Sequence, residues 1–283
     1  LGTVAGALLG YHLLEPQKHG VADAFAVGGM FTGTYIGGSV NLNAVALQYG
    51  VTKSGTLFAA INAADNIVTT IWIVVTMLLP RFLQRRWPRK IPSGAANPAT
   101  AGATANLETH EPVRVTDLAL LLALGLGSLF VSQAISAWLP SVPYVLTLTT
   151  VALLLAQLPL IQKLRGARLL GYFTVLLFLA VVGAYCDIPA LLANGSVALT
   201  LLAWGAIIIG IHGLIIFGLG ALFRQDWATI SIASNANIGG ATTAGVLATA
   251  IGRDDLRLPG ILAGSLGNAL GTYAGLLVAV WLR

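Results

Sequence analysis

Long apolar runs separated by short polar stretches predict a chain of helices that cross a lipid bilayer. Several runs reach the roughly 20 residues that one helix needs to span the hydrocarbon core. None alternates apolar and polar residues as the strand of a membrane barrel does. The pattern therefore predicts an all-α, polytopic membrane protein with these helical segments: 1–14, 20–50, 55–80, 117–139, 143–160, 169–190, 196–223, 227–250 and 259–282.

Two of these segments carry related motifs around a pair of glycines, TYIGGSVNLNAVA at 34–46 and NIGGATTAGVLA at 237–248. A shift of 202 positions superposes Ile36 on Ile238, Gly37 on Gly239, Gly38 on Gly240, Ala46 on Ala248, Gly50 on Gly252, Asn66 on Asn268 and Thr70 on Thr272. This indicates an internal duplication. We predict a first repeat at 1–90, a flexible cytoplasmic linker at 91–115 and a second repeat at 116–283. Because the chain begins within an apolar run, we also expect helices before Leu1.

The glycine pairs predict that both segments are discontinuous helices that cross each other and meet in the membrane. Glycine lowers the cost of non-helical backbone, and such backbone lies in a membrane only where it lines protein or a cavity. The broken ends expose N–H groups that attract an anion and carbonyls that attract a cation. The predicted substrate-binding residues are Gly37, Gly38, Ser39, Asn41, Asn237, Gly239, Gly240, Thr242 and Thr243. The alternative is that these small polar residues only join helices.

Asp65 is the most informative single residue, because an ionisable group inside an apolar span is costly and is usually functional. We predict that it binds a coupling ion, sodium or a proton, together with Asn66, Asn268 and Asn235. A carboxylate beside a water-filled vestibule, or one neutralised by a proton, is the alternative. Asp187 is expected at an interfacial helix end and His212 in a hydrogen-bonded contact between helices. Asp23 and Asp226 are expected to cap the starts of the broken segments.

Composition excludes a soluble protein, since 57% of residues are hydrophobic and only 9% are charged. The net charge of +5 lies in short loops, so we read it as a signal of orientation and expect no nucleic-acid partner. Assigning the loops alternately to the two sides places twelve basic residues on one side and three on the other, namely Lys53, Arg253 and Arg257. The larger set is predicted to be cytoplasmic. Both broken segments then run in the same direction, and the sequence leaves open whether the repeats are parallel or inverted.

The glycine motifs, NAADN at 62–66, SNANIGGATTAG at 234–245 and GSLGNALGTYAG at 264–275 resemble the uncharacterised YjcL-like family of membrane proteins, domain of unknown function 819. The resemblance spans nearly the whole chain. It places the chain in the cation–proton antiporter and anion transporter superfamily. This implies two structural repeats, crossed discontinuous helices in a core domain and elevator-type alternating access. It implies no particular solute.

We therefore expect a secondary active transporter of a small organic solute, anionic or zwitterionic, coupled to sodium or protons. A passive channel and a non-transport scaffold or sensor are the alternatives. The sequence lacks metal-ligand spacing, a GxSxG motif and a phosphate-binding loop, so no enzymatic activity and no cofactor other than a sodium ion is expected. The expected partners are the solute and the bilayer, with a homodimer left open. The expected location is a bacterial inner membrane, with the plastid envelope as the alternative.

Overall fold

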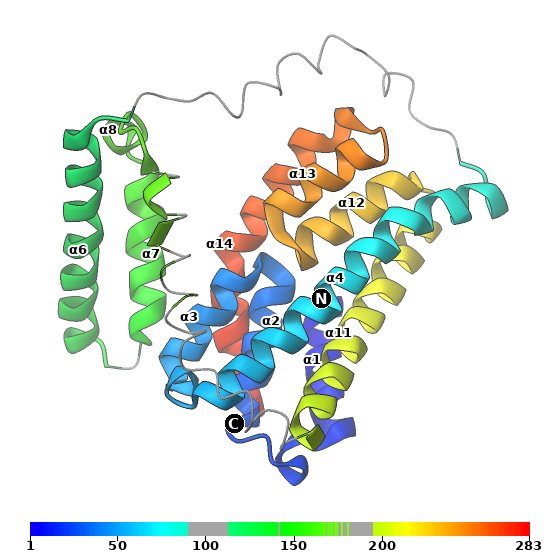
Figure 1. Ribbon diagram of the computed structural model, residues 1–283, viewed down its shortest axis with the longest axis horizontal. Helices are drawn as coiled ribbons and strands as arrows, with labels where there is room; N and C mark the ends of the chain where they lie inside the picture. Colours follow the sequence, from blue (N-terminus) through cyan, green and yellow to red (C-terminus); the bar gives the residue numbers. More distant parts are fainter. Residues whose placement is uncertain are drawn as a thin grey trace. The chain divides into compact units, whose positions relative to one another are not determined.

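The computed structural model describes residues 1–89, 113–140, 142–167 and 195–283, with scattered residues between 169 and 180, and the regular elements in these ranges are helices. They form two compact units (Figure 1), each described here by itself. Unit 1 contains residues 1–89 and 195–283, and unit 2 contains the described residues from 113 to 180. Four helices in the described part are long and apolar enough to cross a membrane. The predicted all-helical structure is thus confirmed for the described residues, and these four helices are consistent with a membrane protein.

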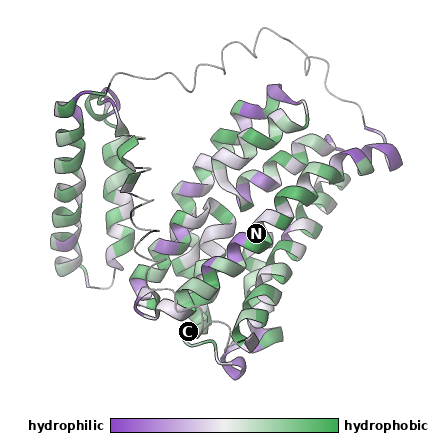
Figure 2. Ribbon diagram, viewed as in Figure 1, coloured by the Kyte–Doolittle hydropathy of each residue, from purple (hydrophilic) through white to green (hydrophobic). Residues whose placement is uncertain are grey.

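Unit 2 is a pair of apolar helices. It consists of α6 (Val115–Trp138), α7 (Tyr144–Ala156) and the short α8 (Pro159–Gln162). Side chains such as Phe130 are exposed, and most of both long helices is hydrophobic in Figure 2, as expected of surfaces that face lipid. Most of the predicted linker, Asp187 and much of the predicted segment 169–190 lie outside the described residues.

Unit 1 brings together helices from both predicted repeats. Its three long helices, α4, α11 and α14, run along the unit, and its shorter helices pack against them (Figure 1). The helices are α1 (Gly2–Leu14), α2 (Ala24–Gly37), α3 (Ser39–Tyr49), α4 (Gly55–Arg86), α11 (Gly195–Leu222), α12 (Trp227–Ile238), α13 (Gly240–Ala250) and α14 (Arg257–Leu282).

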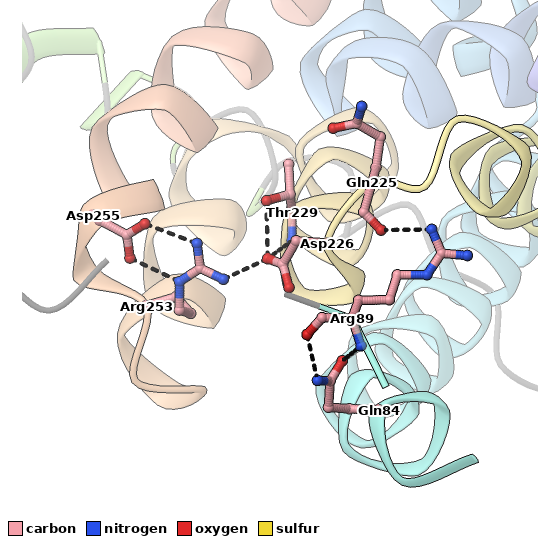
Figure 3. A network of polar contacts seen from close by, with 7 residues as sticks. All are labelled: Gln84, Arg89, Gln225, Asp226, Thr229, Arg253 and Asp255. Carbon is pink, nitrogen blue, oxygen red and sulfur yellow. Dashed lines mark hydrogen bonds and ion pairs between the residues drawn. The ribbon is translucent and has the colours of Figure 1, made fainter. Parts of the chain in front are cut away.

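Both predicted breaks are present, but neither broken segment crosses the unit. The Phe25 and Tyr49 rings, at the two ends of the first segment, lie 5.2 Å apart. At the two ends of the second segment, the Arg253 guanidinium donates a hydrogen bond to Asp226 (Figure 3). A continuous helix would separate each pair by roughly 36–40 Å at 1.5 Å per residue. Each segment is therefore a hairpin, which corrects the prediction of crossing discontinuous helices. We call α2–α3 hairpin A and α12–α13 hairpin B.

The hairpins enter unit 1 from opposite ends. The helix α4 spans about 48 Å between them, from a lysine end near Lys18 and Lys53 to an arginine end at Arg81, Arg85, Arg86 and Arg89. Hairpin A starts and finishes at the lysine end, where Gly20 and Ser54 line one cavity. Hairpin B starts and finishes at the arginine end, because the Arg89 guanidinium donates to Gln225 O at 3.2 Å and Trp227 Nε1 donates to Trp87 O at 2.9 Å. Figure 1 shows the two hairpins toward opposite ends of α4.

This arrangement corrects the distribution of charge predicted by alternating loops. Arg253 and Arg257 lie at the arginine end, and Lys18 lies with Lys53 at the other. Arg283 also lies at the lysine end, since its guanidinium is 5.8 Å from the centre of the Phe25 ring. The alternating assignment was wrong because it counted each hairpin as a crossing. Among the described basic residues of unit 1, the arginine end holds seven and the lysine end three, with the seven being Arg81, Arg85, Arg86, Arg89, Arg224, Arg253 and Arg257.

A labelling experiment tests this topology. In a Cys186→Ala background, Lys53→Cys is expected to react with a membrane-impermeant maleimide from outside intact cells. Asp254→Cys is expected to react only after the cells are permeabilised, because positive residues favour the cytoplasmic side. Both positions are exposed. Labelling of the two cysteines from the same side would contradict the hairpin topology and would support the alternating assignment.

Two glycines allow α14 to pack directly on the backbone of hairpin A. A Cβ at Gly275 would lie 2.6 Å from Gly29 O, and one at Gly271 would lie 2.8 Å from Gly33 O. Real Cβ atoms do not approach backbone oxygens so closely, so a side chain at either position would force the helices apart. Small residues of this kind bring helix backbones together in membranes. This contact fixes α14 beside the tip of hairpin A.

Candidate functional site

The tips of the two hairpins meet inside unit 1. Asn237, in the last turn of α12, donates its Nδ2 hydrogens to Tyr35 O in the last turn of α2 at 2.5 Å and to Thr3 Oγ1 on α1 at 3.1 Å. A Cβ added to Gly240 would lie 3.7 Å from Gly37 O. The four half-helix ends, each with unpaired backbone groups, are therefore gathered at one place.

The Asp65 carboxylate contacts the tip of hairpin A. The side chain extends from α4, is 2% exposed and lies within 3.2–3.3 Å of the Thr34 hydroxyl through both oxygens. The Ser39 hydroxyl donates to Asp65 Oδ2 at 3.2 Å. Since Thr34 lies in the last turn of α2 and Ser39 begins α3, the carboxylate lies at the break itself. It also lies near the positive end of the α3 dipole, which stabilises a negative charge.

Hairpin A is joined to α14 through amide and hydroxyl groups. The Thr272 hydroxyl donates to Asn41 Oδ1 at 2.6 Å, and Asn41 Nδ2 lies 3.5 Å from Asn268 Oδ1. A Cβ on Gly38 would lie 3.6 Å from the same Asn268 oxygen. Gly38 has φ +94°, a conformation that strongly favours glycine. The duplicated asparagine of α14 is therefore at the tip of hairpin A.

Hairpin B is joined to α4 and α11. Asn235 Nδ2 donates to Thr76 Oγ1 at 3.1 Å, and Trp72 Nε1 donates to Ser234 Oγ at 3.0 Å. His212 Nε2 lies 3.0 Å from the same Ser234 oxygen, which is the helix–helix contact predicted for this histidine. At the tip, the Thr243 hydroxyl donates to Gly240 O at 3.1 Å.

The base of hairpin B is closed by a buried ion pair (Figure 3). Arg253 binds Asp226 through Nη1 and binds both oxygens of Asp255 through Nε and Nη2, at 2.9 and 2.8 Å. The hydrogen bonds to Asp255 raise the pKa of the Arg253 guanidinium above its usual value. Asp226 also caps α12 by accepting from Thr229 N at 3.1 Å, as predicted. Asp23 occupies the corresponding position before α2 but makes no side-chain capping bond.

The structure leaves two predicted site residues away from these contacts. Asn66 is exposed, although Asp65 beside it is buried, because neighbours on a helix point about 100° apart. Thr242 is exposed on the first turn of α13. The remaining predicted residues lie at the two tips or are bonded to them.

Several contacting residues were not predicted, among them Thr3, Thr34, Trp72, Thr76 and Thr272. Thr34 is the first residue of the first glycine motif, so the motif itself contained the signal. Thr272 had a signal as well, since the duplication aligns it with Thr70. Nothing in the local sequence of Thr3, Trp72 or Thr76 indicates contact with a hairpin.

Comparison with known proteins agrees with a membrane protein of this kind. A family model described as "Protein of unknown function (DUF819)" matches residues 1–283. The chain is 28% identical over 298 residues to the "Uncharacterized membrane protein YjcL" of Bacillus subtilis (strain 168), covering 99% of this chain and 73% of that protein. No solved structure matches the chain. The chain therefore belongs to the membrane protein family of unknown function DUF819.

Proposed function

We propose that this protein is a secondary active transporter that couples the movement of a small organic solute to sodium ions or protons. One observation carries the proposal: two hairpins that enter from opposite ends bring their tips together beside a buried carboxylate. In transporters, unwound backbone at the middle of the membrane is where solute and coupling ion bind. Such backbone is tolerated in a bilayer only where it lines protein or a cavity.

The two tips offer groups that suit both a coupling cation and an anionic solute. Asp65 brings a carboxylate to hairpin A, so this tip suits the coupling cation, with the Thr34 and Ser39 hydroxyls beside it. No described acidic side chain makes a hydrogen bond to the first turn of α13, whose N-terminus carries a partial positive charge. That end, with exposed Thr242, suits an anionic group of the solute. An anionic or zwitterionic solute is therefore proposed.

The opposed hairpins also support an inverted-repeat architecture. Hairpin A with α4 and hairpin B with α14 follow the two aligned parts of the sequence and enter from opposite ends. In this proposal the arginine end is cytoplasmic, by its excess of basic residues, and the membrane is a bacterial inner membrane. The close contact of α14 with hairpin A supports elevator-type access, in which these elements move as one body.

Solute uptake tests the function directly. Metabolites that raise the melting temperature of the purified full-length protein, with or without sodium, would be presented to sealed liposomes containing it. We expect concentrative uptake driven by an imposed sodium or proton gradient and abolished by the matching ionophore. Downhill flux alone would indicate a channel. Neither binding nor flux across the metabolite set would favour a scaffold.

A further inference from the structure

Gly239, at the tip of hairpin B, lies beside two side-chain oxygen atoms. Its backbone has φ −98° and ψ −7°, a conformation that residues with a side chain other than proline adopt, so the turn itself does not require glycine. The surrounding side chains do require glycine, because an added Cβ would collide with Thr243 Oγ1 and would lie 3.2 Å from Asn235 Oδ1. One side-chain oxygen from each arm of hairpin B thus points toward the space that a side chain at position 239 would fill.

The Asn235 oxygen has no hydrogen-bond donor among the described residues, although the side chain is fully buried at 0% exposure. Its orientation follows from Thr76. The Thr76 hydroxyl hydrogen is directed to the carbonyls of Trp72 and Ile73, at 2.9 and 3.0 Å, so Thr76 Oγ1 accepts from Asn235 Nδ2. This turns Oδ1 toward Gly239. A buried acceptor without a donor requires an explanation, and an unseen ion or water is the usual one.

Thr243 presents its oxygen in the same way. Its hydroxyl hydrogen is used by Gly240 O at 3.1 Å, which leaves oxygen lone pairs available to a ligand. The last turn of α12 ends beside these atoms, and the carbonyls of a helix C-terminus carry partial negative charge. The site thus offers neutral oxygens only, a set that suits a hard cation. No group of three His, Cys, Asp or Glu suited to a metal ion occurs in the described residues.

We propose that Asn235 Oδ1, Thr243 Oγ1 and the terminal carbonyls of α12 form a sodium site, separate from Asp65. The site has no group that takes up a proton near neutral pH, so it binds a metal cation and cannot carry a proton in its place. The role of this site in coupling rests on the proposed transport function. If the site takes part in transport, at least one coupling ion is sodium. Binding itself can be measured without any solute.

The test uses the purified full-length protein without solute. Its melting temperature is measured against increasing NaCl, with KCl and choline chloride at matched ionic strength, from pH 6 to 8.5. We expect a sodium-specific increase that Asn235→Ala or Thr243→Ala shifts to sodium concentrations about ten-fold higher or more. Gly239→Ala, which places a carbon atom in the site without straining the backbone, is expected to have the same effect. Asn62→Ala is the matched control, because the one side-chain bond of Asn62 to a described residue is within its own helix, at Phe58 O.

The outcomes separate this site from the transport function. Wild-type sodium affinity in folded Asn235→Ala and Gly239→Ala proteins would overturn the site. So would equal stabilisation by all three salts, which would indicate that water occupies the position. Specific sodium binding that these variants weaken, in a protein that moves no solute, would support the site and reject the transporter. Uptake driven by protons and indifferent to sodium would support the transporter and overturn the site.

Discussion

Asp65→Asn is expected to reduce ion-driven uptake by the full-length protein to the level of protein-free liposomes. The amide keeps the shape of the side chain but removes the charge that would hold a cation at hairpin A. Removing a group that only bonds to a metal ligand lowers metal affinity by roughly 10–100-fold. Removing a charged ligand itself should lower cation affinity by about 100-fold or more. Uptake and sodium titrations on one preparation measure both effects.

The stability of the same variant distinguishes function from structure. The partners of the buried Asp65 carboxylate that hydrogen bonds identify are hydroxyl groups, and no positive charge lies within ion-pair distance among the described residues. A buried charge without an ionic partner costs free energy. Asn is neutral and can accept from one hydroxyl through Oδ1 and donate to another through Nδ2, so it should leave the free energy of unfolding equal or higher.

Asp117→Asn is the matched control, since Asp117 lies in unit 2 and, among the described residues, its side chain accepts from Arg165 N, at 3.3 Å. Uptake should be unchanged in that variant. If Asp65→Asn transported at the wild-type rate, the carboxylate would have no role in coupling. If it lost stability together with transport, Asp65 would be a structural residue of the hairpin A break.

The breaks themselves could be predicted from the sequence, but the direction of the chain after each break could not. A glycine pair indicates only that the helix is interrupted. Whether the next half-helix continues or returns depends on contacts between residues far apart in the chain, such as Phe25 with Tyr49. One local signal was available: the segment 20–50 is longer than the roughly 20 residues of a single crossing and is long enough to return.

The burial of Asp65 could also be inferred from the sequence, and the same reasoning predicts that Asn66 is exposed. Buried residues of α4 include Phe58, Ile61, Asp65 and Val68, spaced as one face of a helix. That spacing alone places Asn66 off the buried face. The partners of Asp65 could not be read in this way, because they depend on how hairpin A docks on α4.

Arg253→Met is expected to produce a large loss of stability, because it breaks the buried ion pair of hairpin B. The Arg253 and Asp226 side chains are only 9% and 8% exposed, so removing the guanidinium leaves a carboxylate buried without its partner. Breaking a buried ion pair from one side costs about 3–5 kcal/mol. The free energy of unfolding, measured by denaturant titration of the full-length protein, should fall by about this amount. Because Arg253 joins the two arms of hairpin B, solute uptake should fall as well.

A double-mutant cycle isolates the cause of that loss. Adding Asp226→Asn to Arg253→Met removes the unpaired charge, so the double variant should recover much of the lost stability, although the amide still caps α12. Arg81→Gln is the matched control: Arg81 is exposed at the same end of unit 1, and its loss should change stability by no more than about 0.5 kcal/mol. If Arg253→Met were no more destabilised than Arg81→Gln, the ion pair would not be what closes hairpin B. The Trp227 and Arg89 contacts at its first arm would then have to hold the hairpin in place.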